Sequence, residues 1–481
     1  MSESTASGKS VSRRRLLRFA ALAATAAAVA PALEACSSQP AAPSGSAGQA
    51  PAPTQGGAAP AAAPTAARVV PGQTGAAPAP AAAGGKTITL LHENCFIKEF
   101  DDFFQQTLSQ QYQKEAGVTV NYDLVSVNTL QTKVSAAVET SAGPDATLLQ
   151  FNWAQLYDQK LVDLTDIADD LGKKMGGWVD VIKDAVVVNG KWKAIPIGNI
   201  GQLMVYRTDW FKEVGYDKFP ETWDELLEAG TKLKAKGHPF GFEYGHGFGD
   251  NHGWMYPLLW SFGGREVDKD GKKVVLDSDE TAKAVDFTRT LYQKAQLQDV
   301  LGWTDPSNNK SFLSEQISCT NNASSILSAA KTDFPNIAAN VGHALNPKGP
   351  GGERFQLLNP WTHAVFTFAS DLQASRAFMK WLNDEKQFSA WLASADAYYA
   401  PFLHAYDNHP MWNSEPRMQP YKESVQYSHL PGWPSAPGRA TAESLAKYVI
   451  CDMFAKAAQG ESTSSVISGA TAQLKGIYGT S

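Results

Sequence analysis

Three short apolar runs decide the fold class: KTITLLHE (Lys86–Glu93), VTVNYDLV (Val118–Val125) and PDATLLQF (Pro144–Phe151). The segments between them, 98–116 and 127–140, repeat apolar residues at helical spacing, and Gly117 ends the first of them. Buried strands that alternate with helices indicate a parallel sheet with crossover helices. The sequence therefore predicts an α/β fold.

The carboxyl ends of these strands carry polar and aromatic side chains. His92, Glu93 and Asn94 end or follow the first strand, and Asn152 and Trp153 follow the third. Ligands of open α/β sheets bind beyond the carboxyl ends of the strands. We expect these five residues to lie at a ligand cleft.

The N-terminus reads as an export signal, residues 1–36. SRRRLLR (Ser12–Arg18) resembles a twin-arginine signal with Arg13 and Arg14 as the pair, and a short Ala-rich run follows it. That run is too short and too weakly apolar for a transmembrane helix. General secretion remains an alternative route.

The signal ends in a lipobox-like sequence, Leu33-Glu34-Ala35-Cys36, so Cys36 is the expected lipid attachment site and would anchor the chain to a membrane. Glu34 stands where that pattern usually has a small residue, and cleavage after Ala32 is the alternative. Residues 37–85 are almost wholly Ala, Pro, Gly, Ser, Gln and Thr, which predicts a disordered tether.

Charge and length restrict what the remaining body, residues 86–481, can do. Six of the 42 basic residues precede Lys86 but only two of the 48 acidic ones do, so the body is more acidic than the whole chain, whose formal charge is −6. Nucleic acid is not an expected partner, because phosphate binding needs a basic surface. The body has nearly four hundred residues, which is more than a single hydrophobic core usually contains, so its length favours two lobes.

The cysteines suggest neither a redox nor a metal site. Cys95, Cys319 and Cys451 are odd in number and lack CxxC or Cys/His spacing. We expect small buried residues, with any disulfide left open. No motif calls for a metal or another cofactor, and no catalytic residue is assigned.

Longer stretches carry a family resemblance over nearly all of residues 86–481. GKWKAIPIGNIGQLMVYRTDWFKEVGYDKFPETWDELLEAGTKLKAKG (Gly190–Gly237) is the strongest of them. GPDATLLQFNWAQLYDQKLVDLTD (Gly143–Asp166) and ALNPKGPGGER (Ala344–Arg354) agree with it. In this order the stretches resemble the extracellular solute-binding proteins of bacterial ABC importers, family 1, the sugar-type group.

The resemblance implies two α/β lobes of the periplasmic-binding-protein type, type II, with the ligand cleft between them. The first lobe would hold 86–200 and 366–415, and the second 201–365 and 416–481. The chain would be an exported, lipid-anchored monomer at the cell surface or in the periplasm. It would bind a sugar, oligosaccharide or similar polar solute and deliver it to ABC permease subunits, without catalysis and without a cofactor.

The expected ligand site combines aromatic plates with hydrogen-bonding groups. Flat aromatics cover the apolar faces of sugars, and carboxylates, amides and imidazoles pair with the hydroxyls. The expected ligand-binding residues are His92, Glu93, Asn94, Asn152, Trp153, Asp250, Trp254, Asn321, Asn322, Trp361 and Tyr398.

Two other classes of protein stay open as alternatives. A secreted carbohydrate-active enzyme would need two carboxylates facing a cleft, and Glu93 with Asp250 would be such a pair. A sensor or adhesion lipoprotein would only dock to a partner.

Overall fold

The structure, a computed structural model, describes residues 86–480. The signal with Arg13 and Arg14, the lipidation site Cys36 and the tether 37–85 lie outside the described residues. No helix within 86–480 combines the length and apolar character that crossing a bilayer requires.

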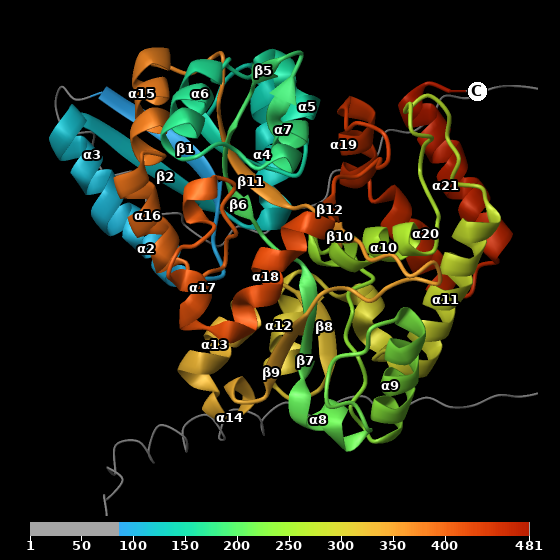
Figure 1. Ribbon diagram of the computed structural model, residues 1–481. Helices are drawn as coiled ribbons and strands as arrows, with labels where there is room; N and C mark the ends of the chain where they lie inside the picture. Colours follow the sequence, from blue (N-terminus) through green and yellow to red (C-terminus); the bar gives the residue numbers. More distant parts are fainter. Residues whose placement is uncertain (1–85, 481) are drawn as a thin grey trace, which may run out of the picture. The chain divides into compact units, whose positions relative to one another are not determined.

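The first lobe is built around a five-stranded sheet in the order β2-β1-β3-β11-β6 (Figure 1). β1 runs parallel to β2 and β3, whereas β11 is antiparallel to both β3 and β6. The three strands expected from the sequence are confirmed as parallel neighbours. The strand bounds are β1 Lys86–Glu93, β2 Val118–Val125, β3 Ala146–Gln150, β6 Ile195–Asn199 and β11 Pro360–Val365.

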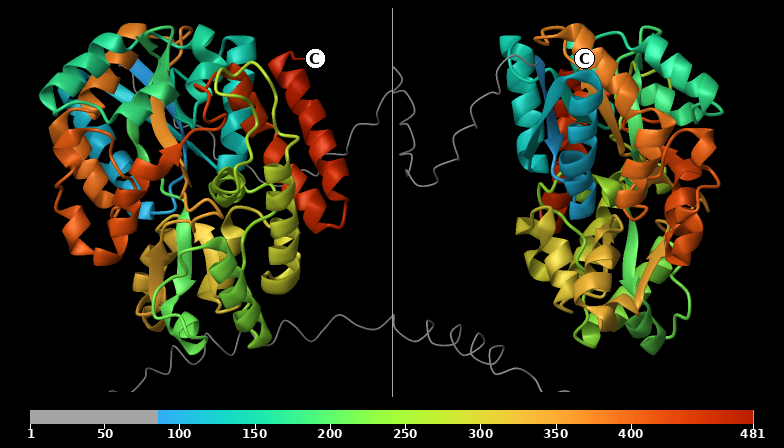
Figure 2. Two further views of the ribbon diagram at one scale, coloured as in Figure 1. Left: turned by 45° about the vertical axis from the view of Figure 1, so that its right-hand side comes forward. Right: turned by 90° about the vertical axis from the view of Figure 1, so that its left-hand side faces the viewer.

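Helices cover both faces of this sheet (Figures 1 and 2). On one face, Phe104 contacts Phe378 and Trp391 with ring centroids 6.2 and 5.3 Å apart. On the other face, α4 (Val127–Thr140) and α5 (Trp153–Tyr157) contact each other through the hydroxyl groups of Ser135 and Tyr157, which lie 2.8 Å apart. The first set is α2 (Lys98–Phe103), α3 (Ser109–Ala116), α15 (Leu372–Leu382) and α16 (Glu385–Ser394), and the second includes α4, α5 and α7 (Asp180–Val186).

β11 differs from the boundary expected for the second lobe. Residues up to 365 were expected there, but β11 begins at Pro360 and lies inside the first sheet. All six of its residues are buried, including the polar Thr362 and His363, so it lacks the apolar–polar alternation that marks a half-exposed strand. The chain therefore returns to the first lobe about six residues earlier than expected.

The second lobe contains a three-stranded antiparallel sheet in the order β8-β7-β9. Its strands are β7 (Leu203–Arg207), β8 (Cys319–Asn322) and β9 (Val341–Ala344). The main helices of this lobe are α9 (Trp223–Ala235), α10 (Asp250–Ser261), α11 (Asp279–Ala295), α20 (Val449–Ala458) and α21 (Thr463–Tyr478).

Residues 238–264 are rich in Gly and aromatic side chains, and from sequence alone we expect a loop that enters a short helix, but α10 is longer and more deeply buried than that. All twelve of its residues are buried, including Pro257. Gly249 precedes it with φ 103°, a conformation that favours glycine. This helix fixes the position of Asp250, its first residue.

Three helix starts follow the capping signals in the sequence. Thr222 and Glu225 form a capping box at α9. Ser278 accepts a hydrogen bond from the Thr281 N–H, and Asp371 accepts one from the Ala374 N–H. Residues 372–393 repeat apolar residues at helical spacing, so the sequence predicts one helix after Asp371. The structure has two, because Asp384 caps the second, α16.

Short elements complete the two lobes. The helices are α6 (Thr165–Lys174), α8 (Thr208–Glu213), α12 (Pro306–Leu313), α13 (Ser325–Asp333), α14 (Pro335–Ala338), α17 (Met411–Ser414), α18 (Gln419–Ser424) and α19 (Arg439–Ala446). The strands are β4 (Val187–Val188) with β5 (Lys191–Trp192), and β10 (Gln356–Leu357) with β12 (Ser428–His429).

The lobes are joined where chain segments cross near Asn199. The backbone N–H and C=O of Asn199 pair with those of Ala400 at 2.8 and 2.9 Å. Its side-chain Oδ1 accepts from the Asn359 N–H at 2.9 Å, and Ile200 donates to the Asn359 carbonyl at 3.0 Å. These bonds tie three crossings of the chain into one hinge.

The three cysteines of the described part are buried and free. Cys95, Cys319 and Cys451 lie in different parts of the fold, and burial raises the pKa of each thiol. Buried thiols with raised pKa react slowly, in keeping with the structural role expected from the sequence.

The loop Lys348–Gly352 generates a stability prediction. A Cβ added at Gly349 would lie 1.9 Å from the Ser261 carbonyl oxygen, which is backbone and cannot rotate away. We expect Gly349→Ala to lower the free energy of unfolding by about 1–3 kcal/mol, the usual cost of overpacking. Thermal or urea denaturation measures this loss.

Gly351→Ala is the matched control. It lies in the same loop, has no atom within 4 Å of an added Cβ, and should change stability by less than about 0.5 kcal/mol. Equal stability of the two variants would contradict the tight contact at Gly349.

Candidate functional site

A small cavity lies between the lobes, against the hinge. Its free volume is about 20 Å³, room for about one water molecule. It is lined by Glu93, Phe96, Val127, Gln150, Ile200, Gln202, Phe248, Asp250, Asp305, Asn322, Asn359, Trp361 and Tyr398. The lobes are thus closed on each other, and a solute enters only if they part.

The first lobe supplies one wall from the edge of its sheet. Glu93 and Gln150 are the last residues of β1 and β3, and Trp361 stands near the start of antiparallel β11. All three therefore reach the same edge, as the carboxyl-end rule predicts. The Gln150 side-chain amide donates to the Glu93 carboxylate.

The second lobe supplies the facing wall. Asp250 begins α10, Asn322 ends β8, and Asp305 immediately precedes α12. Asn308 Nδ2 donates to Asp250 Oδ2 at 2.6 Å, and Asn322 Nδ2 donates to Asn308 Oδ1 at 3.0 Å. The Asp250 side chain is therefore held by the Asn308 amide, which the Asn322 amide holds in turn.

Several buried polar atoms at the cavity have no hydrogen-bond partner in the described structure. They are Gln202 Oε1, Asn359 Oδ1 and Trp361 Nε1. The three residues are 6 %, 4 % and 1 % exposed, respectively. An unpaired buried polar atom costs free energy, so these groups favour a bound molecule that completes their bonds.

The cavity is strongly acidic, and its carboxyl groups hold protons at unusually high pH. Desolvation, with the negative charge of Asp305 second, raises the pKa of Glu93, of Asp250 and of neighbouring Glu243, the last to about 8. Desolvation raises the pKa of Asp305 itself to about 7. No Lys, Arg or His lines the cavity to offset these charges.

Five of the residues expected at the ligand site line this cavity: Glu93, Asp250, Asn322, Trp361 and Tyr398. They come from both lobes and from the hinge, although they are distant in the sequence. Their role as ligand contacts stays a prediction.

The structure places the other six expected residues elsewhere. Trp254 is in the core of the second lobe, where Nε1 donates to the Glu243 carbonyl at 2.9 Å. His92 is buried behind Trp361, with ring centroids 5.3 Å apart, and Asn94 is exposed. Strand alternation accounts for the last pair, because only one face of a strand end meets the cavity.

Asn152, Trp153 and Asn321 lie near the cavity without lining it. Asn152 Nδ2 donates to Thr441 Oγ1 at 2.8 Å and so joins the first lobe to α19. Trp153 packs on Phe248, with centroids 5.3 Å apart. Asn321 Nδ2 donates to Asn346 Oδ1 at 3.1 Å.

Sequence reasoning missed eight lining residues, of which four are polar. Gln150 was within reach of the carboxyl-end rule, since it ends β3. Gln202 and Asn359 belong to the crossing segments, and Asp305 to a connection between η3 (Gln298–Gly302) and α12. No local pattern marks these three, because the tertiary fold alone brings them to the cavity.

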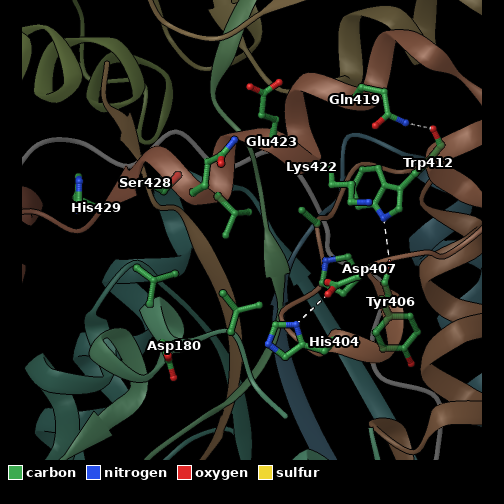
Figure 3. Close-up of a pocket in the computed structure, with 16 residues that line it drawn as sticks. Asp180, His404, Tyr406, Asp407, Trp412, Gln419, Lys422, Glu423, Ser428 and His429 are labelled. Atoms are coloured by element: carbon green, nitrogen blue, oxygen red, sulfur yellow. Dashed lines mark hydrogen bonds and ion pairs between the residues drawn. The ribbon is translucent and has the colours of Figure 1, made fainter. Parts of the chain in front are cut away.

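A second and larger hollow is lined by residues that include His404, Asp407 and Lys422 (Figure 3). Its volume is about 980 Å³, and Ala400 and Pro401 line it while Tyr398 faces the small cavity. Figure 3 shows His404 and Asp407 paired on one side, at 2.9 Å, and Glu423 and Lys422 of α18 on another. Among residues 86–480, no three His, Cys, Asp or Glu side chains are grouped to hold a metal ion.

A family model described as bacterial extracellular solute-binding protein matches residues 107–420. A putative binding protein of Brucella abortus is 25% identical over 280 residues, 52% of this chain and 61% of the relative. The chain thus spans about three fifths of that relative. The erythritol/L-threitol-binding protein of Mycolicibacterium smegmatis is 24% identical over 341 residues, 64% of this chain and 68% of the relative.

Solved structures share the fold. A maltose-bound protein of T. maritima superposes with TM-score 0.71 at 24% identity, covering 82% of this chain and all of the other. A solute-binding protein of Agrobacterium radiobacter in complex with ribitol gives 0.68 at 19% identity, covering 82% and 99%. These likenesses confirm the two-lobe α/β fold, and the proteins concerned are solute-binding proteins rather than enzymes.

The acidity of the cavity generates a pH prediction for Asp305. Near pH 4 its carboxyl is protonated in the folded protein and still about half protonated in the unfolded protein, so the two states differ little there. As pH rises from 4 towards 7, the Asp305 carboxyl ionises in the unfolded protein but stays protonated in the folded protein. The free energy of unfolding of the wild type therefore falls, whereas Asp305→Asn, which cannot ionise, does not undergo this loss. The titratable groups that face Asp305 act in the same direction or stay neutral: Glu93, Glu243, Asp250, Tyr398 and Tyr448.

We therefore expect Asp305→Asn to match the wild-type Tm at pH 4 and to exceed it by roughly 4 °C or more at pH 8, in line with a shift worth up to about 4 kcal/mol. Scanning calorimetry of the solute-free protein at four pH values measures the difference. Asp299→Asn, at an exposed site, is the control. A Tm difference independent of pH would contradict the assigned electrostatics.

Proposed function

Because this chain belongs to the bacterial extracellular solute-binding proteins, we propose that it captures a small polar solute outside the cytoplasm and delivers it unaltered to the permease of an ABC importer. The cavity supports this function, since both lobes line it with carboxyl, amide and aromatic groups. A solute that contacts both walls stabilises the closed arrangement only through those contacts.

The solute belongs, in this proposal, to the sugars, oligosaccharides or polyols. One relative is named for binding erythritol and L-threitol, another for binding diacetylchitobiose, and similar folds hold maltose and ribitol. The cavity offers the matching chemistry, because Trp361 and Tyr398 present ring surfaces while Gln202 and Asn359 have unpaired polar atoms. These groups would pair with hydroxyls.

The carboxyl pair Glu93 and Asp250 does not make a glycosidase the better proposal. Both groups accept hydrogen bonds from side-chain amides, Glu93 from Gln150 and Asp250 from Asn308. Capture without turnover accounts for the site with no further reactant.

Capture predicts stabilisation by the right solute. In a thermal-shift screen of mono- and oligosaccharides, polyols and phosphate esters, we expect a subset to raise Tm, since a ligand at 100 times its Kd adds about 2.7 kcal/mol. Phe96→Ala should weaken the binding of such a solute about tenfold, because the Phe96 side chain lines the cavity and is 39 % exposed.

Phe334→Ala is the matched control, because Phe334 is 41 % exposed but ends α13, away from the cavity. Its affinity for the ligand should equal that of the wild type. NMR of the solute after prolonged incubation should show it unchanged, and cleavage would identify an enzyme instead.

The anchor is a separate part of the proposal. We propose that Cys36 carries lipid and that Arg13 and Arg14 direct export. Cells fed a labelled fatty acid should label the wild-type chain, whereas Cys36→Ser should be unlabelled and released into the medium or periplasm. Ser37→Ala is the control, and labelling of Cys36→Ser would refute the assignment.

A further inference from the structure

The cavity between the lobes contains acidic residues without a basic partner. Glu93, Asp250 and Asp305 line it, and Glu243 lies beside it, whereas no Lys, Arg or His is among its lining residues. The bonds that these groups accept come from amides, Gln150 to Glu93, Asn308 to Asp250 and the Gly247 N–H to Glu243. The site thus gathers carboxyl groups that no basic side chain of the cavity lining can pair with when they ionise.

The unpaired atoms of the cavity point to a ligand rich in hydrogen-bond donors. Gln202 Oε1 and Asn359 Oδ1 are acceptors, both residues are more than nine-tenths buried, and both line the cavity. These two unpaired acceptors outnumber the one unpaired donor among the cavity's lining residues, Trp361 Nε1. A hydroxyl offers one donor, whereas an ammonium group offers three donors and no acceptor.

Closure brings the acidic groups of the two lobes together. Glu93 belongs to the first sheet, whereas Asp250 and Asp305 belong to the second lobe, and Phe248 packs against Phe151 and Trp153 across the same interface. In this water-poor space, without a positive partner, the ionised forms of the three carboxyl groups are disfavoured, which raises their pKa values. A positive group between them favours the ionised forms and is attracted to them, so it favours the closed arrangement by more than a neutral solute does.

We propose that the captured solute is a polyhydroxy compound with a protonated amine, an amino sugar or amino polyol, whose ammonium group binds between Glu93, Asp250 and Asp305. This inference rests on the capture function proposed above. Aromatic rings complete the site, because Trp361, Tyr398, Phe248 and Phe96 line the same cavity and ring faces attract cations. An anionic solute would find no basic side chain among the lining residues.

Matched probes test this inference directly. Glucosamine, N-acetylglucosamine and glucose differ at one position, and so do glucamine and sorbitol. Chitobiose and diacetylchitobiose differ at their two amino groups. Isothermal titration at pH 7 of the intact exported body should give at least tenfold tighter binding for the amine-bearing member of a set. The N-acetyl members keep the nitrogen and add bulk but lose the charge, so they should bind like the neutral members or more weakly.

A second readout separates charge from shape. An ammonium group beside Asp305 favours the ionised carboxyl, so binding near pH 7 should release protons. Titrations in two buffers of different ionisation enthalpy count these protons. A neutral solute that donates hydroxyls should leave the proton count near zero or take protons up.

Variants locate the charge. Asp305→Asn should reduce the preference for the amine over its neutral partner about tenfold, and Asp299→Asn, on the exposed surface, should preserve it. A neutral member that binds as tightly as its amine overturns this inference and leaves the capture function standing. Failure of every probe, neutral and amine-bearing alike, counts against both.

Discussion

The hinge at Asn199 is the constraint on which the rest of the structure depends. One residue pairs with Ala400 through its backbone and with the Asn359 N–H through its side chain, so three crossings of the chain meet at one point. Gln202, Asn359 and Tyr398 of the cavity come from these same crossing segments. The two cavity walls are positioned relative to each other by these bonds at Asn199. The sheets behind the walls can therefore differ, one being five-stranded and mixed and the other three-stranded and antiparallel.

Much of the fold follows from local sequence signals. Alternating strands and helices, the αL glycine at 117 and the caps at Thr222, Ser278 and Asp371 all lie where the sequence predicts them. β11 does not, because a strand buried on both faces lacks alternation and its partners, β3 and β6, are distant in the chain. The length of α10 was also missed, since its Gly and Pro content argues locally against a helix.

The candidate site was partly predictable for the same reason. Glu93 ends a strand that the sequence defines, so a topological rule places it at the cavity. Trp254 resembles a loop aromatic in sequence, but α10 turns it into the core. Asp305 has no local signature, yet its charge influences Glu93, Asp250 and Glu243, so the electrostatics of the cavity were accessible only from three-dimensional structure.

The separation of the three buried thiols has a consequence for how the protein matures. Cys95, Cys319 and Cys451 are each enclosed by their own surroundings and unlinked, so the body needs no oxidant to reach its final form. No disulfide among residues 86–480 has to form in the cell or in a cytoplasmic expression host. The export that we propose for Arg13 and Arg14, in which a folded body would cross the membrane, is compatible with this.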